Sequence, residues 1–202
     1  MTSIHSEKMN LQIHDRPIWQ SVQQSTQHYL EQMERLSLEQ LRRQPAEEEW
    51  SLGQMLLHLS QAALRMQFEN ARRCLSEPAA LSDRPSASIA EDSALPKTQA
   101  GEAMFRVGSF PPQRVKIPAS PQYTPPQPDS KEQIRAALDQ VLEALEELEP
   151  LAASTLSQQT VAHPRLGGLT AKEWLQLTEM HYRHHLLQEE RLLMELGLDS
   201  HH

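Results

Sequence analysis

Apolar side chains recur every three or four positions along four stretches of the chain, residues 18–36, 52–66, 134–148 and 174–196. This period places the apolar positions on one face of an α-helix. The low aromatic content and the many Leu, Glu and Gln residues also favour helix over sheet. The pattern therefore predicts an all-α fold built on four long helices.

Signals for helix ends flank these stretches. Asp15 is placed to cap the first helix, with Pro17 in its opening turn. A Ser or Thr followed three residues later by Gln or Glu, the capping-box pattern, precedes the other three helices. These boxes begin at Ser51, Ser130 and Thr170. We expect Pro150 to end the third helix and Gly197 to end the fourth.

Proline is concentrated in the middle of the chain, where ten of the fourteen prolines lie between Pro78 and Pro128. Because proline lacks a backbone N–H and disfavours helix, residues 78–129 are expected to form a long crossover that is mostly loop. Its first half, to Gly101, is expected to be mobile, and its second half to pack on the body through apolar anchors. These anchors are Phe105, Val107, Phe110, Val115, Ile117 and Tyr123.

A crossover of this length lets helices two and three run in the same direction. The prediction is therefore a four-helix bundle of up-down-down-up topology. We place one bundle domain at residues 15–197, between a flexible N-terminal extension (1–14) and a C-terminal tail (198–202). His201 and His202 lie in that tail and have no part in the functional argument.

The charge and the cysteine content of the chain exclude several classes of partner and site. The 19 Lys and Arg residues against 27 Asp and Glu residues leave a net charge of −8, which argues against a nucleic-acid partner. The single cysteine, Cys74, excludes an internal disulfide and a Cys-rich zinc site, and we expect it to be an ordinary, partly buried residue. The chain shows no signal-peptide core and no membrane-length apolar stretch. We therefore expect a cytoplasmic protein with no membrane partner.

The last predicted helix carries a candidate metal-binding pair, His181 and His185. Residues four apart on a helix point the same way, so these two imidazoles can hold one ion. Both lie on the stripe that also contains Trp174 and Leu192, which should face the core. Two buried imidazoles need polar partners, and either a shared metal or hydrogen bonds to neighbours would supply them.

A third ligand would have to come from another helix. His58, near the rim of the second helix's apolar stripe, is the natural candidate, while His28 and His163 belong to no recognisable constellation. The chain contains no H-E-x-x-H, no Glu-x-x-His, no phosphate-binding loop and no G-x-S-x-G. The acidic run Glu143, Glu146, Glu147 and Glu149 is expected to form a solvated face.

Three segments together resemble the DinB-like (YfiT-like) superfamily of metal-binding four-helix bundles. Residues 50–59, Trp-Ser-Leu-Gly-Gln-Met-Leu-Leu-His-Leu, resemble the family's Trp-Ser opening of helix two with a histidine two turns on. His181-x-x-His184-His185-x-x-Gln188 and the following Arg-Leu-Leu-x-x-Leu-Gly resemble its closing helix. The Pro-Pro pair before helix three is also similar. The resemblance covers residues 15–197, and Gln54 departs from it, since relatives often carry Glu there.

This resemblance implies a divalent metal, nickel or zinc, held by His58, His181 and His185. It also implies that His184 or Gln188 contacts one of these ligands and orients it. It implies a metal-dependent enzyme such as a thiol transferase acting on a small-molecule substrate, for example a low-molecular-weight thiol. A metal-dependent hydrolase and a non-catalytic dimerisation or binding module are the alternatives. Relatives often form homodimers, so we expect one here. No general base can be assigned.

Overall fold

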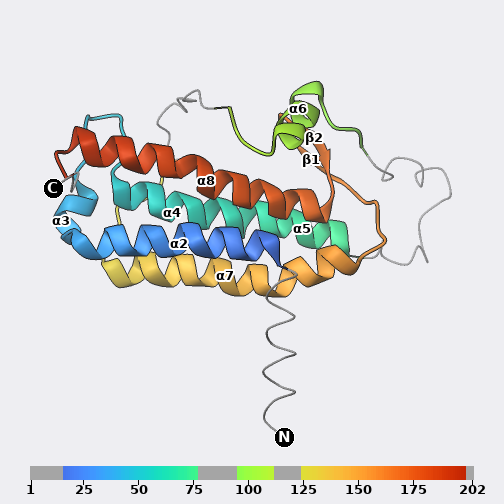
Figure 1. The fold of residues 1–202 in the computed structure, drawn as a ribbon, viewed down its shortest axis with the longest axis horizontal. Coiled ribbons are helices and arrows are strands. Elements are labelled where there is room, and N and C mark those ends of the chain that lie inside the picture. Colours follow the sequence, from blue (N-terminus) through green and yellow to red (C-terminus); the bar gives the residue numbers. More distant parts are fainter. Residues whose placement is uncertain (1–15, 77–94, 112–123, 199–202) are drawn as a thin grey trace, which may run out of the picture.

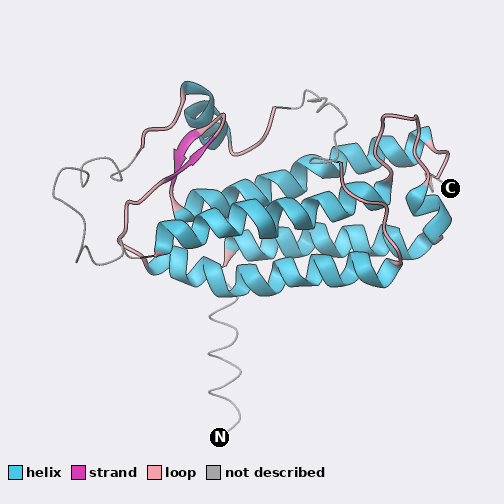
Figure 2. Ribbon diagram, turned by 180° about the vertical axis from the view of Figure 1, so that it is seen from behind, coloured by secondary structure: helices cyan, strands magenta, loops and turns pink. Residues whose placement is uncertain are grey.

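The computed structural model describes residues 16–76, 95–111 and 124–198. Four long helical segments lie side by side, and a small hairpin and a short helix sit at one end of the bundle (Figure 2). The long segments are α2 (Pro17–Arg35), α4–η1–α5 (Leu52–Ala62, Ala63–Gln67, Phe68–Leu75), α7 (Lys131–Ser154) and α8 (Ala171–Glu195). The shorter elements are α3 (Leu38–Arg42), α6 (Gln99–Val107), β1 (Val161–His163) and β2 (Gly167–Leu169). The all-α prediction is confirmed.

The bundle has the predicted up-down-down-up topology. Helices α4 and α7 both begin at the end marked C in Figure 1 and run the same way, whereas α2 and α8 run in the opposite direction. The starts of α4 and α7 are tied together through the chain that leads into α7. Gln54 Nε2 donates to the carbonyl of Pro125 at 2.7 Å, and Arg42 Nε donates to that of Pro128 at 2.7 Å. The departure at Gln54 from the family pattern thus has a structural use.

The predicted caps of the last three helices form. The side chains of Ser51 and Thr170 accept the N–H three residues on, and their own backbone N–H groups donate to the side chains of Gln54 and Glu173. The Ser130 side chain accepts the Gln133 N–H, and the Gln133 side chain accepts the Asp129 N–H. Gly197, with φ of 62°, follows α8, and the Leu198 N–H bonds back to the Leu193 carbonyl. Helix α8 therefore ends where the sequence predicts.

Helix α2 begins differently from the expectation. Asp15 lies outside the described residues, and Arg16 at the N-cap makes no side-chain cap. Instead, Glu149 of α7 accepts the N–H groups of Ile18 at 2.9 Å and Trp19 at 3.0 Å. Glu149 is only 5% exposed, so its place on a solvated face was a wrong prediction. A carboxylate suits this place because the start of a helix carries unpaired donors and partial positive charge.

Pro150 does not end its helix, contrary to the sequence prediction. Helix α7 continues through it to Ser154. The proline is exposed, while Leu148 and Ala152 on either side of it are buried. The missing N–H costs one intrahelical bond, and the burial of the flanking apolar residues maintains the helix.

The crossover contains regular structure that the sequence did not reveal. Helix α6 is capped by Thr98 and packs on the β1–β2 hairpin, where the Thr98 N–H bonds to the Leu166 carbonyl at 2.9 Å. The approach is close, since a Cβ added at Gly101 would lie 2.3 Å from the Leu166 carbonyl oxygen. The hairpin lies outside the crossover, between α7 and α8, and its strands of three residues each are too short to show the two-residue alternation that marks a strand.

The apolar anchors of the crossover behave unequally. Phe105 and Phe110 pack against the core, as expected, whereas Val107 is 73% exposed. Val115, Ile117 and Tyr123 lie outside the described residues. So do residues 78–94, which make up most of the half that was expected to be mobile (78–101), while Gln99–Gly101 belong to α6. Val107 ends α6 on the side away from the body, so its apolar character carried no information about packing.

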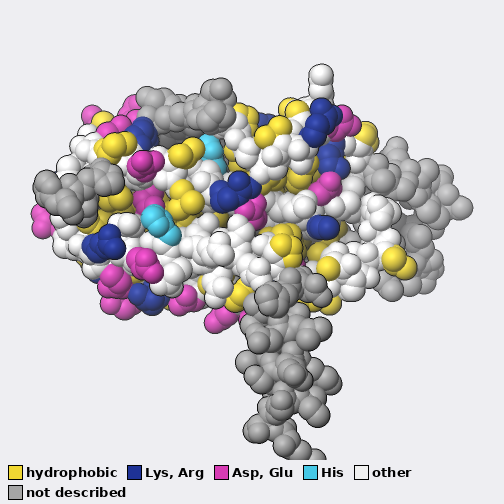
Figure 3. Space-filling model, viewed as in Figure 1, with side chains coloured by type: hydrophobic (Ala, Val, Ile, Leu, Met, Phe, Trp, Pro, Cys, Tyr) yellow, Lys and Arg dark blue, Asp and Glu magenta, His cyan; other side chains and the backbone are white. Residues whose placement is uncertain are grey.

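The bundle core is aliphatic with a few large rings, including Tyr29, Phe68, Trp174 and Tyr182, each fully buried. Acidic and basic side chains are interspersed on the face seen in Figure 3 and do not gather into a patch of one sign there. None of the described helices is long and apolar enough to span a membrane.

Candidate metal centre

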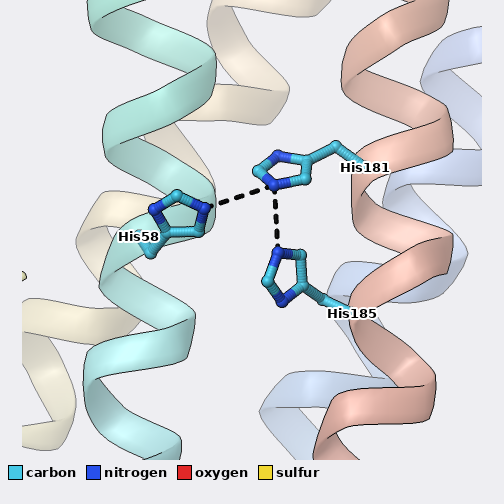
Figure 4. A group of neighbouring side chains, drawn as sticks. All are labelled: His58, His181 and His185. Carbon is cyan, nitrogen blue, oxygen red and sulfur yellow. Dashed lines mark hydrogen bonds between the residues drawn. The ribbon is translucent and has the colours of Figure 1, made fainter. Parts of the chain in front are cut away.

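Three histidine rings from two helices face one another across the α4–α8 interface (Figure 4). His58 projects from α4, and His181 and His185 project from successive turns of α8. The Nε2 atom of His181 lies 3.2 Å from that of His58 and 3.0 Å from that of His185. One potential ligand atom of each residue lies within 4.8 Å of the others. The structure thus brings together the three residues that the resemblance implies.

Hydrogen bonding alone does not account for this convergence. A neutral imidazole nitrogen either donates one hydrogen or accepts at one lone pair. His181 Nε2 is the shared member of both close pairs, so it can make one good hydrogen bond at most, whichever tautomer is present. Three imidazole nitrogens gathered within 4.8 Å of one another suit a cation better than they suit one another.

The distances fit a divalent transition metal. Metal–nitrogen bonds are about 2.0–2.1 Å long, so two nitrogens at roughly 90–110° around one ion lie about 2.8–3.4 Å apart. The observed 3.0 and 3.2 Å fall in that range. Within the described residues, no carboxylate or thiol joins the group, so the donor set is three imidazoles. Imidazole suits zinc, nickel and copper.

Burial keeps the three rings neutral. It lowers the pKa of His58 to about 4 and the pKa of His185 to about 3, in the latter with a smaller contribution from the neighbouring histidines. Burial and the same neighbours lower the pKa of His181 well below its usual range. At neutral pH the lone pairs are therefore free to bind a metal, which requires the unprotonated imidazole.

Aromatic rings flank the cluster. The Trp50 ring lies 4.8 Å from that of His58, and the Phe110 ring lies 6.0 Å from that of His181 and 5.5 Å from that of His184. Phe110 follows α6, and the preceding Gly108 carbonyl accepts a hydrogen bond from Arg183 of α8 at 2.6 Å. The end of α6 is thereby held over the histidines.

The two residues predicted to support the ligands lie beside the cluster. His184 is half-buried, with its ring centre 5.7 Å from that of His185, and it stands outside the converging group. The Gln188 side chain lies close enough to His185 to favour its charged form and so opposes the effect of burial on its pKa. Neither placement tests the predicted supporting role.

The remaining candidates fall elsewhere. His163 Nδ1 accepts the backbone N–H groups of Arg165 and Leu166, which shapes the hairpin turn. Cys74 is buried and donates to the Leu169 carbonyl, and burial raises the pKa of its thiol. Cys74 was predicted to be partly buried, and it is fully buried instead.

Sequence reasoning missed a pair next to the cluster. His28 of α2 bonds the buried Glu189 of α8 at 2.7 Å between Nε2 and Oε2. The available signal was the position of Glu189, one turn after His185 and on the same side of the helix. A charged residue on an apolar stripe is rarely buried without a partner.

A bundle that presents three imidazoles from two facing helices belongs to the class of helical proteins with a candidate metal site in the core. The family model of the DinB superfamily matches residues 21–188, which is most of the chain. The chain therefore belongs to the DinB superfamily, and the resemblance seen in its motifs is confirmed. Comparisons with curated proteins and with solved structures found no match.

Proposed function

We propose that this protein binds one divalent ion, nickel or zinc, through His58, His181 and His185. The observation that carries the proposal is that the Nε2 atoms of His58 and His185 both lie close to that of His181. The two distances suit a shared metal ion, and two such contacts are more than the hydrogen-bonding capacity of one imidazole nitrogen. The neutral state of the rings supports it. Three protein ligands leave coordination positions for water or substrate, the arrangement of catalytic sites.

We further propose that the bound ion serves a metal-dependent enzyme, with transfer of a low-molecular-weight thiol as its reaction. Such an ion acts as a Lewis acid that makes a thiol or water nucleophilic at neutral pH. The buried Cys74 is committed to the Leu169 carbonyl, so a reacting thiol would have to come from a substrate. Trp50 and Phe110 would bound the space next to the ligands and restrict the substrate's shape.

Metal analysis of protein purified without nickel resin tests the first proposal. We expect about one equivalent of metal in the wild type and its loss in His58→Ala and His185→Ala. His163→Gln, at a histidine outside the cluster, is the matched control and should retain the metal. A metal-free wild type whose stability is unchanged by added zinc or nickel would refute the proposal.

A screen of the metal-loaded protein with several thiols and electrophiles tests the second proposal. Thiol-dependent turnover that disappears in His185→Ala supports transfer. Ester or amide hydrolysis without any thiol would instead identify a hydrolase, and inactivity in both assays would favour a binding module. We also expect a homodimer, which light scattering of the eluting protein would measure.

A further inference from the structure

A buried carboxylate lies one helical turn beyond the metal-binding histidines. The Glu189 side chain of α8 is 2% exposed, and its Oε2 atom bonds His28 Nε2 at 2.7 Å. Its Oε1 atom is also buried but has no hydrogen-bond partner among the described residues. A carboxylate oxygen left in this state is costly, because burial removes water without replacing its hydrogen bonds.

His185 also has a buried ring nitrogen without a hydrogen-bond partner among the described residues. Its Nε2 atom faces the cluster, while its Nδ1 atom is buried without a partner among the described residues. Residues four apart share a helix face, about 6 Å along the axis, and their side chains lean toward the N-terminus. Glu189 therefore leans toward His185, and one unsatisfied acceptor and one unsatisfied nitrogen lie on successive turns.

We propose that Glu189 is a positioning residue for His185, and that His28 links this carboxylate to the surface. The inference rests on the proposed metal site. Once Nε2 holds an ion, the proton of neutral His185 must sit on Nδ1, and this N–H needs an acceptor. Glu189 supplies it, directly or through one water molecule. Carboxylate–histidine–metal arrangements of this kind fix the tautomer and raise the basicity of the ligand.

The connection continues to solvent through His28 of α2. The His28 side chain is about half exposed, at 48%, against 2% for Glu189. The Tyr29 hydroxyl is committed to the Tyr182 carbonyl at 2.6 Å, so it is not the partner of Glu189. The order from the inside outward is ligand imidazole, carboxylate, surface imidazole.

Gln188 is the competing acceptor. Its side chain influences the pKa of His185, but it makes no hydrogen bond of normal geometry to Nδ1. Burial raises the pKa of Glu189, whereas His28 lowers it, and the carboxylate form accepts a stronger bond from an N–H donor than a neutral amide does. We therefore assign the role to Glu189. If Gln188 were the acceptor instead, zinc affinity would fall in Gln188→Ala and not in Glu189→Gln.

Zinc affinity, measured by competition with a chromophoric chelator, separates these alternatives. We expect Glu189→Gln to bind zinc about 10–100-fold more weakly than the wild type, the usual cost of losing such a partner. Glu190→Gln, at the exposed neighbouring glutamate, is the matched control and should bind normally. Gln188→Ala should lose much less than Glu189→Gln, and His28→Gln should fall between control and Glu189→Gln.

Nitrogen NMR of the zinc-loaded wild type gives a readout that a merely structural role would not move. We expect His185 to bear its proton on Nδ1, and we expect a strong hydrogen bond to deshield this proton. The signal of the proton should shift upfield in Glu189→Gln. A wild type that binds zinc while Glu189→Gln matches Glu190→Gln in affinity would overturn the inference. So would zinc bound at Nδ1 of His185, a result that holds even if Glu189→Gln fails to fold. A wild type that binds no metal would refute the proposed function itself.

Discussion

Three acidic or imidazole side chains on α7 and α8 do their work from buried positions. Glu149 of α7 caps the start of α2, His185 belongs to the histidine cluster, and Glu189 forms a hydrogen bond with His28. Each is less than 7% exposed. Burial makes each residue's hydrogen-bond partners decisive, because a buried polar group without a partner costs more than its bond contributes.

Replacing Glu149 should destabilise the bundle. A glutamine can accept only one of the two N–H groups, from Ile18 and Trp19, and turns its own NH₂ toward the other. We expect Glu149→Gln to lower the free energy of unfolding by about 1–2 kcal/mol, as loss of a helix cap does. Urea unfolding would measure it. Glu147→Gln, on the exposed side of the same helix, is the control and should change little.

The metal-free protein should lose stability as the pH falls below about 6.5. Burial lowers the pKa of His58 to about 4 and the pKa of His185 to about 3 from the usual 6.5. Between these values the unfolded chain binds more protons than the folded one, so protonation favours unfolding. Urea midpoints in chelator from pH 7.5 to 4.5 should fall, and His58→Gln should flatten the decline. Identical pH profiles would contradict this account.

At the scale of elements, two local rules give way to packing. Helix α7 passes through Pro150, and the second long helix passes through the π-helical turn η1 between α4 and α5. Both interruptions lie within helices whose buried faces continue on either side. Isolated propensities are worth a few kcal/mol at most, which the burial of several apolar side chains exceeds.

Removing the proline should therefore stabilise α7. Pro150→Ala restores an N–H donor and loses no buried contact, since Pro150 is exposed. We expect the free energy of unfolding to rise by about 1–3 kcal/mol, the difference in helix propensity being partly offset by a less restricted unfolded chain. Thermal unfolding followed by circular dichroism would show it. A lower midpoint would indicate that the proline ring itself is needed.

The α6–hairpin contact depends on the lack of a side chain at Gly101. A Cβ there would lie 2.3 Å from the backbone oxygen of Leu166, which cannot move as a flexible side chain could. We expect Gly101→Ala to weaken the docking of α6 and to speed proteolytic cleavage between residues 95 and 111. Gly108→Ala is a useful contrast, because nothing lies within 4 Å of an added Cβ and only its φ of 70° opposes the change.

At the scale of the whole molecule, the candidate metal site joins α4 to α8. His58 is more than a hundred residues from His181 in sequence, so an ion shared by them would cross-link two halves of the chain. A ligand that binds only the folded state stabilises it in proportion to its binding.

Zinc or nickel should therefore raise the unfolding temperature. At a free-metal concentration about a hundred times the Kd, the gain is about 2.7 kcal/mol. Differential scanning fluorimetry should show this shift in the wild type and its loss in His58→Ala. The shift of each protein is measured from its own unfolding temperature in chelator, which removes the effect of the substitution on the metal-free protein. An equal shift in both would place the ion elsewhere.

The prediction from the sequence was strongest where periodicity and caps agree. The four long helices, the box at Ser51 and the stop at Gly197 follow from local rules acting over one or two turns. The hairpin and α6 could not be predicted, because β1 and β2 pair over three residues each and α6 lies within a proline-rich stretch.

The candidate site divides in the same way. Helical spacing alone directs His181 and His185 to one face, and the family motif adds His58. Only the packing of α4 against α8 brings the Nε2 atom of His58 to 3.2 Å from that of His181. Only the packing of α2 against α8 and α7 gives Glu189 and Glu149 their partners. Which residues share a helix face is a local property of the chain. Which faces meet, and which polar groups are then closed off from water, is decided by tertiary structure.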